Sequence, residues 1–138
     1  MPQHGTVRGV SVVPDIVCGL ELPDGSRRHF MVEIDRGTMP ISRADIAQTS
    51  FEKKMRVYLT AHAAKQHERQ FGWKTFRVLA ITTDHERVQS MKEALRALRV
   101  PRSLGPSLFL FAIFDELRAG DPLAHDWSDG DSRAVRLI

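Results

Sequence analysis

The feature that most restricts the fold of this chain is a turn sequence, Pro23-Asp24-Gly25, between two runs of residues that favour β-strands. Pro fits the first position of a type I turn, Asp the second, and Gly the left-handed position that closes a three-residue hairpin loop. Residues 12–22 and 26–35 are therefore predicted to pair as an antiparallel hairpin. A three-residue loop sets the register, which places Asp15 opposite Glu33, Val17 opposite Met31 and Gly19 opposite His29.

This register gives the hairpin two different faces. Asp15, Glu33 and Asp35 share one face, at the end far from the turn, whereas a two-residue turn would separate them. Like charges that lie opposite one another destabilise a sheet unless something neutralises them, and a divalent cation with oxygen ligands does so. The alternative is that each acid is simply solvated. The other face is apolar nearly throughout and carries Ile16, Cys18, Leu20, Phe30, Val32 and Ile34.

A lysine on a predicted helix belongs with these acids. Lys54 and Tyr58 are four residues apart, so they lie on one helical face, and Lys54 borders an apolar stripe. If this helix packs across the sheet, the Lys54 amine could stabilise negative charge that develops on a phosphate. The alternative is a lysine whose aliphatic stem covers the stripe. The spacing alone does not decide between them.

The remaining pattern predicts an α/β fold with a mixed sheet in two or three layers. Residues 1–5 are expected to be disordered. The predicted strands are 6–13, the hairpin, 75–83, 107–114 and an edge strand at 134–138, and the predicted helices are 43–70, with Ser42 as N-cap, and 84–99, capped by Asp84. Residues 36–41 are expected to form a loop. Trp73 and Trp127 are predicted to be packing anchors.

Length and composition fit one globular domain. The chain has 138 residues, of which 42% are hydrophobic and 27% charged, and its net charge of +3 permits a polyanionic partner without demonstrating one. A single cysteine, Cys18, fits a reducing compartment. The sequence contains no apolar run long enough to span a bilayer and no signal-peptide core. We therefore expect a cytoplasmic protein that does not enter a membrane.

Several short blocks carry a resemblance to a known family. They are Pro14-Asp15, Glu33-Ile34-Asp35-Arg36-Gly37-Thr38, Lys54-x-x-x-Tyr58, Phe76-Arg77-Val78-Leu79, Thr82-Thr83 and Arg87. The chain resembles the C-terminal domain of the replication-relaxation family, which is associated with plasmid and mobile-element replication and is similar to PD-(D/E)xK nuclease folds. The resemblance covers about residues 12–114. It implies a single nuclease-like domain over 1–138, without the winged-helix region of that family.

The resemblance also implies roles for individual residues. Asp15 and Glu33 match the two metal-binding acids, with Mg²⁺ or Mn²⁺ as cofactor and DNA as substrate. Asp35 stands where the motif normally has lysine, and it would ligate a second ion or orient water. Lys54 would replace the missing lysine from the helix, with Tyr58 in support. A homodimer, or a fused or separate DNA-binding domain, is a further possible partner.

Other readings stay open. One alternative is a domain that keeps the fold without its chemistry and serves as a non-cleaving DNA-binding or scaffolding domain, and another is a domain that mediates protein contacts. His62 and His67 are five residues apart, which misses the spacing of a helical zinc pair, and both are expected to be solvated.

Overall fold

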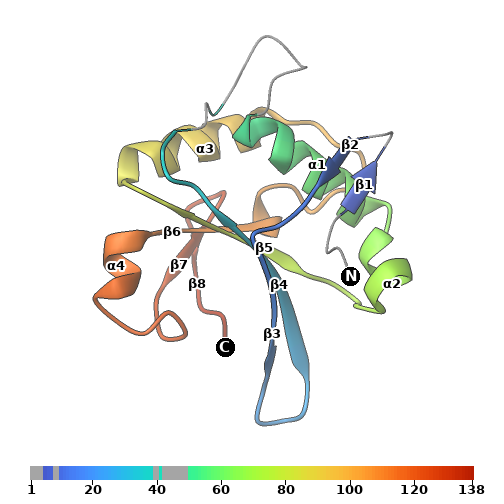
Figure 1. The fold of residues 1–138 in the computed structure, drawn as a ribbon, viewed down its shortest axis with the longest axis horizontal. Helices are drawn as coiled ribbons and strands as arrows, with labels where there is room; N and C mark the ends of the chain where they lie inside the picture. The colour runs from blue at the N-terminus through green and yellow to red at the C-terminus, as the bar shows by residue number, and fades with distance from the viewer. Residues whose placement is uncertain (1–4, 8–9, 39–40, 42–49) are drawn as a thin grey trace.

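The computed structural model describes residues 5–7, 10–38, 41 and 50–138 (Figure 1). Strands β3 to β8 form one mixed sheet in sequential order, and β1 and β2 form a separate two-stranded sheet. The expected α/β fold with a mixed sheet and an antiparallel hairpin is thus confirmed. The strands are β1 (Gly5–Val7), β2 (Val10–Val12), β3 (Ile16–Glu21), β4 (Arg27–Ile34), β5 (Arg77–Thr82), β6 (Phe109–Ile113), β7 (Trp127–Asp129) and β8 (Ala134–Val135). The helices are α1 (Phe51–Ala63), α2 (Gln66–Phe71), α3 (His85–Ala97) and α4 (Phe114–Arg118), with a 3-10 helix at Gly105–Leu108.

The predicted turn joins β3 to β4. The Leu22 N–H donates to the Ser26 carbonyl at 2.8 Å, which closes a three-residue loop. Gly25 has a φ of 86°, in the left-handed region where a Cβ is unfavourable. The predicted register is confirmed along the whole of β3. The pairs are Ile16 with Val32, Val17 with Met31, Cys18 with Phe30, Gly19 with His29, Leu20 with Arg28 and Glu21 with Arg27.

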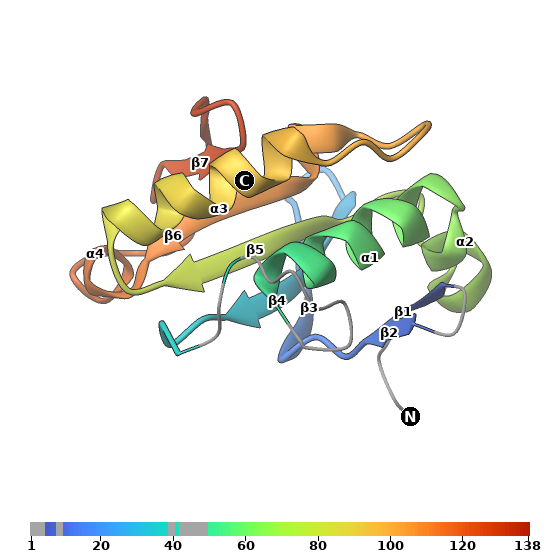
Figure 2. The same cartoon turned by 90° about the horizontal axis from the view of Figure 1, so that it is seen from above.

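Helices α1 and α3 lie side by side on one face of the sheet (Figure 2). Helix α1 connects β4 to β5, and α3 connects β5 to β6, so these three strands run parallel and end along the same edge of the sheet. The core between helices and sheet is apolar, and α3 contributes Val88, Met91 and Leu95 to it. Its buried members include Met31, Phe51, Met55, Tyr58, Leu59, Val78, Ala80, Val88, Met91, Leu95, Leu98, Phe109, Phe111 and Ile113.

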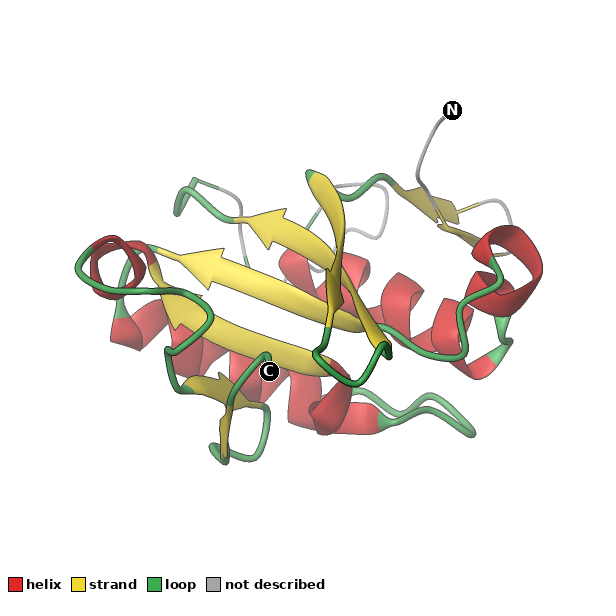
Figure 3. Cartoon of the chain, turned by 90° about the horizontal axis from the view of Figure 1, so that it is seen from below, coloured by secondary structure: helices red, strands yellow, loops and turns green. Residues whose placement is uncertain are grey.

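The C-terminal segment packs on the opposite face, which Figure 3 views with the strands in front of the helices. Trp127 is only 1% exposed and its indole donates to the Pro122 carbonyl at 3.0 Å, so its predicted role as a packing anchor is confirmed. Because both faces of the central strands are covered, β5 and β6 are nearly continuous apolar runs. This second core contains Phe30, Val32, Leu79, Leu110, Ala112, Trp127 and Leu137.

The long helix predicted over residues 43–70 is wrong in its extent. Within the described residues α1 begins at Phe51, and Ser50 is its N-cap, accepting a hydrogen bond from the Lys53 N–H at 3.1 Å. A hydroxyl at this position satisfies one of the unpaired N–H groups of the first turn. The predicted cap, Ser42, lies outside the described residues.

The same helix is also interrupted near its C-terminal end. Lys65 has a φ of 57°, which is left-handed and separates α1 from α2. Neither Gly nor Pro marks this break in the sequence. Burial of His67, which is 3% exposed, accompanies the change of direction. The expectation that His62 and His67 are both solvated is therefore wrong for His67.

Three further elements differ from the sequence prediction. In place of one strand over residues 6–13, the structure has two antiparallel strands, β1 and β2, in which Val7 pairs with Val10. The strand predicted over 107–114 is shorter, since Pro106 lies in a 3-10 helix before it and Phe114 already starts α4. The edge strand predicted over 134–138 is present as β8, but it covers only Ala134–Val135. The predicted disorder of residues 1–5 falls outside the described residues except for Gly5, which begins β1.

None of the helices that the structure describes has the combination of length and apolarity required to cross a membrane.

Candidate functional site

The candidate site lies at the edge where the parallel strands end. Ile34 pairs with Ile81, and Thr82 pairs with Ile113, so the last residues of β4, β5 and β6 are neighbours. In open α/β sheets, ligands commonly bind outside the carboxyl ends of the strands. The five residues predicted to form the site are all found at or near this edge, but they divide into two groups.

Glu33 is the centre of the first group. Its side chain is only 2% exposed, beneath α1. The Tyr58 hydroxyl donates to Glu33 Oε1 at 2.7 Å, and the Lys54 amine lies 3.3 Å from Oε2. Burial raises the pKa of Glu33, and the negative charge of Asp15 adds to the increase, although the bonds from Tyr58 and Lys54 oppose it. The carboxylate thus sits where added positive charge would stabilise its ionised form.

Lys54 and Tyr58 reach Glu33 together because they lie one turn apart on α1. Tyr58 is 2% exposed and Lys54 is 25% exposed, so the amine is the group on this carboxylate that solvent can reach. Burial and the nearby Glu33 carboxylate raise the pKa of Tyr58, which keeps its phenol protonated as a hydrogen-bond donor. The predicted approach of Lys54 to the acid on the sheet is therefore present in the structure.

Asp15 lies just before β3, exposed to solvent. Its Oδ2 accepts a hydrogen bond from the Ile34 N–H at 2.8 Å, and its own N–H donates to the Val32 carbonyl at 3.0 Å. Val32 is also the partner of Ile16 in the strand register, so Asp15 lies beyond the last regular pair of the hairpin. The carboxylate caps the end of the hairpin next to Glu33, and the charges of the two acids influence one another.

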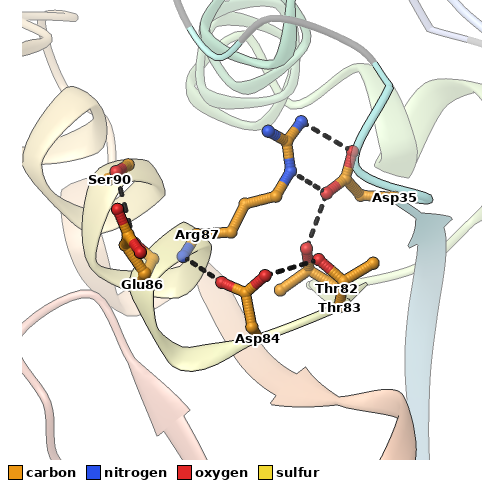
Figure 4. Close-up of polar contacts among 7 residues, drawn as sticks. All are labelled: Asp35, Thr82, Thr83, Asp84, Glu86, Arg87 and Ser90. Atoms are coloured by element: carbon orange, nitrogen blue, oxygen red, sulfur yellow. Dashed lines mark hydrogen bonds and ion pairs between the residues drawn. The ribbon is translucent and has the colours of Figure 1, made fainter.

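Asp35 belongs to a second group, next to α3 (Figure 4). Thr82 Oγ1 donates to Asp35 Oδ2 at 2.6 Å, Arg87 Nη2 donates to Oδ1 at 2.9 Å, and Arg87 Nε also donates to Oδ2. Burial alone would raise the pKa of Asp35, but the hydrogen bonds from Arg87 and Thr82 and the Arg87 charge more than offset it and hold the pKa below its usual range. The carboxylate is therefore neutralised by arginine.

The acids do not gather into one cluster of three. Among the residues that the structure describes, no group of three or more His, Cys, Asp or Glu side chains is close enough to hold a metal ion. Asp15 and Glu33 are the two acids left to act on a cation. Two carboxylates suit Mg²⁺, which usually retains several waters and binds through one or two carboxylates. Their hard oxygens suit Mn²⁺ equally.

An open cavity of about 370 Å³ lies beside this edge, after the ends of β5 and β6. Thr83, Phe114, Asp115 and Arg118 line it. Thr83 also approaches Gly37, because a Cβ built on Gly37 would lie 3.5 Å from the Thr83 side chain. The edge is thus accessible from solvent on the side of α4.

Sequence reasoning assigned no role to Thr82 or Arg87. The signal available for them was local. Thr82 ends a buried strand, and Arg87 falls in the first turn of a helix capped by Asp84. Asp84 Oδ1 accepts a hydrogen bond from the Arg87 N–H at 2.8 Å. That pattern places both residues at the sheet edge. It does not indicate that they bind Asp35, which is 52 positions from Arg87 in the chain.

Comparisons of this chain with protein-family models, with curated proteins and with solved structures found no match.

Proposed function

We propose that this chain is a metal-dependent DNA phosphodiesterase domain of the PD-(D/E)xK kind, in which lysine comes from the helix rather than from the strand. The observation that carries the proposal is the environment of Glu33, a buried carboxylate at a strand end with the Lys54 amine 3.3 Å from its Oε2. Asp15 follows Pro14 directly and lies at the start of the neighbouring strand. Two acids and a lysine are the residue types that such nucleases use, here with the lysine supplied from α1.

Asp15 and Glu33 are the residues that would hold Mg²⁺ or Mn²⁺, together with the Ile34 carbonyl. The ion, when bound, supplies positive charge that polarises the scissile phosphate and favours the ionisation of water. Lys54 stabilises the negative charge that grows on the phosphate oxygens, because its amine is the partly exposed cation beside the acids. Tyr58 fixes the orientation of Glu33 by holding Oε1.

A DNA substrate accords with the resemblance of the blocks around Asp15, Glu33 and Lys54 to the replication-relaxation family. In that setting the domain acts in the replication or relaxation of a plasmid or mobile element, as part of a cytoplasmic assembly. The DNA-binding region that the family carries would come from a fused or partner domain, or from a second copy of the chain.

A second candidate is a domain that binds DNA, or acts as a scaffold, without cutting. The observation in its favour is Asp35, which stands where the motif normally has lysine and is already neutralised by Arg87. In this reading Lys54 is simply the counterion that makes a buried Glu33 tolerable.

Incubation of supercoiled plasmid with the protein and Mn²⁺ separates the two candidates. We expect nicked or linear product from the wild type and none from Asp15→Asn or Glu33→Gln. Lys54→Met should slow cleavage by about 100-fold, the scale on which one electrostatic contact to a transition state acts. Glu93→Gln, at an exposed position on α3, is the matched control and should cleave normally.

Plasmid that stays intact at high protein and metal concentration, while a gel shift persists, would exclude the phosphodiesterase and leave the binding domain. Loss of both cleavage and gel shift would exclude the phosphodiesterase and DNA binding alike, and leave the scaffold.

A further inference from the structure

The carboxylate of Asp35 differs from that of Glu33 because one arginine binds both of its oxygens. Thr82 Oγ1 and Arg87 Nε bond to Oδ2, and Arg87 Nη2 bonds to Oδ1. The side chain is 5% exposed, and the Asp35 N–H donates to the Ile81 carbonyl at 2.8 Å. A carboxylate whose charge is already neutralised by a bidentate arginine has little capacity left for a metal ion, and withdrawing it would break this ion pair.

Arg87 is itself held in place. Its backbone N–H donates to the capping carboxylate of Asp84, and the other oxygen of Asp84 accepts from Thr83 Oγ1 at 3.1 Å (Figure 4). The first turn of α3 and the end of β5 are therefore tied together. Asp35 joins the end of β4 to this unit through a bidentate ion pair, the arginine geometry with the greatest directional specificity.

The position of Asp35 in the chain gives this unit a consequence for the acids. Ile34 lies between Glu33 and Asp35, and its N–H holds the Asp15 carboxylate at 2.8 Å. Fixing Asp35 therefore fixes the backbone that carries Glu33 and that orients Asp15. A displacement of about 1 Å in such a segment is enough to impair a site in which two ligands must converge.

We propose that Asp35, Thr82 and Arg87 form a positioning cluster for the Asp15–Glu33 pair, and that Asp35 is not itself a metal ligand. The inference rests on the proposed function, since it concerns the metal pair named there. It replaces the role that the sequence suggested for Asp35. Thr82 and Arg87 become residues that act on the site through Asp35, without touching the substrate.

The test measures Mn²⁺ binding by calorimetry in Asp35→Asn, Arg87→Gln and the double variant. Residues that orient metal ligands typically change affinity by about 10- to 100-fold when they are replaced. We expect each single variant to weaken Mn²⁺ binding by about tenfold, and the double variant to be no weaker than Asp35→Asn, because both changes break one unit. Asp15→Asn and Glu33→Gln should abolish binding.

Arg136→Ala provides the matched control. Arg136 and Asp126 also form an arginine–aspartate pair, but their side chains are 61% and 62% exposed. The control should bind Mn²⁺ as the wild type does. If Asp35→Asn instead abolishes binding as completely as Glu33→Gln, while Arg87→Gln leaves it unchanged, Asp35 is a ligand and the proposal is overturned.

A second readout does not depend on metal. Amide hydrogen exchange of Ile34 reports whether its N–H is still held by Asp15. We expect exchange at Ile34 to quicken at least about tenfold in Asp35→Asn and in Arg87→Gln, with Leu20, at the other end of the hairpin, as an unchanged reference. Unchanged protection at Ile34 in both variants would refute the positioning role. A wild type that binds no Mn²⁺ but shows this exchange pattern would refute the nuclease site alone.

Discussion

The Tyr58 hydroxyl donates to Glu33 Oε1 at 2.7 Å, across 25 positions of the chain, and thereby joins α1 to the end of β4. Both side chains are 2% exposed. A hydrogen bond to a charged group in such a setting is stronger than one between neutral groups. The contact is therefore both a stabilising interaction of the fold and the element that fixes the orientation of the carboxylate.

Replacing this tyrosine by phenylalanine should destabilise the protein. Tyr58→Phe leaves a buried carboxylate with one donor fewer, so we expect the free energy of unfolding to fall by about 1–3 kcal/mol in urea titrations. Thr60→Ala is the control, because the Thr60 hydroxyl bonds the Arg56 carbonyl in an exposed position of the same helix. Equal losses of unfolding free energy in Tyr58→Phe and Thr60→Ala would show that the hydrogen bond to Glu33 adds no more stability than the one in the control.

The raised pKa of Glu33 predicts a dependence of stability on pH. Burial raises this pKa in the folded state, so between about 4.5 and the folded pKa the folded protein holds more protons than the unfolded chain. The contribution of Glu33 to stability must therefore decrease as the pH rises through this window. Glu33→Gln removes the group that titrates and therefore this pH dependence. We expect its stability relative to the wild type to increase from pH 4.5 towards neutrality. Urea unfolding across this pH range measures the difference in stability between Glu33→Gln and the wild type. A difference that stays constant would contradict the prediction.

The lowered pKa of His62 predicts the opposite dependence of stability on pH. Burial, with the charge of His67 nearby, lowers the pKa of His62 from 6.5 to about 4. The unfolded chain then binds the extra proton between pH 6.5 and 4, and stability is lost as the pH falls through this window. Allowing for partial exposure, the loss is about 1–2 kcal/mol. His62→Gln should show a smaller drop in melting temperature over the same range, and an identical drop would argue against this assignment.

Gly130 predicts a packing effect on the far side of the molecule. A Cβ at this position would lie 2.6 Å from Pro106 Cβ and 2.9 Å from Leu95 Cδ2, so Gly130→Ala should destabilise by about 1–3 kcal/mol. Gly120→Ala is the control, because nothing lies within 4 Å of the Cβ added there. Thermal unfolding of Gly130→Ala and Gly120→Ala compares their losses of stability. Equal losses would mean that the backbone at Gly130 shifts freely to accommodate the Cβ.

The hairpin could be predicted because its information is local. The Pro-Asp-Gly turn sets a three-residue loop, and the loop sets which residues of β3 and β4 face one another. The spacing of Lys54 and Tyr58 placed them on one helical face, but it left open whether the Lys54 amine reaches the acids or its stem covers the apolar stripe. In the structure the amine lies 3.3 Å from Glu33 Oε2, and the hydrogen bond from Tyr58 to Glu33 had no signal of its own in the sequence.

The features that escaped prediction depend on distant partners. Asp35 shares the alternation of Glu33, but β4 ends at Ile34, and Arg87 from α3 takes the carboxylate that follows. The left-handed Lys65 has no signal of its own, since the turn there accompanies burial of His67 and not a preference of lysine. In both places tertiary packing decided between conformations that the local sequence leaves equal.

The polar groups that meet around Glu33 and Asp35 all come from positions 15 to 87, whereas the chain beyond α3 supplies mainly apolar backing through β6 and Trp127. The polar contacts around Glu33 and Asp35 and the apolar packing from β6 and Trp127 thus come from different parts of the chain. Sequence drift in the segment after α3 would change how firmly the domain holds together, while leaving the polar contacts around Glu33 and Asp35 in place.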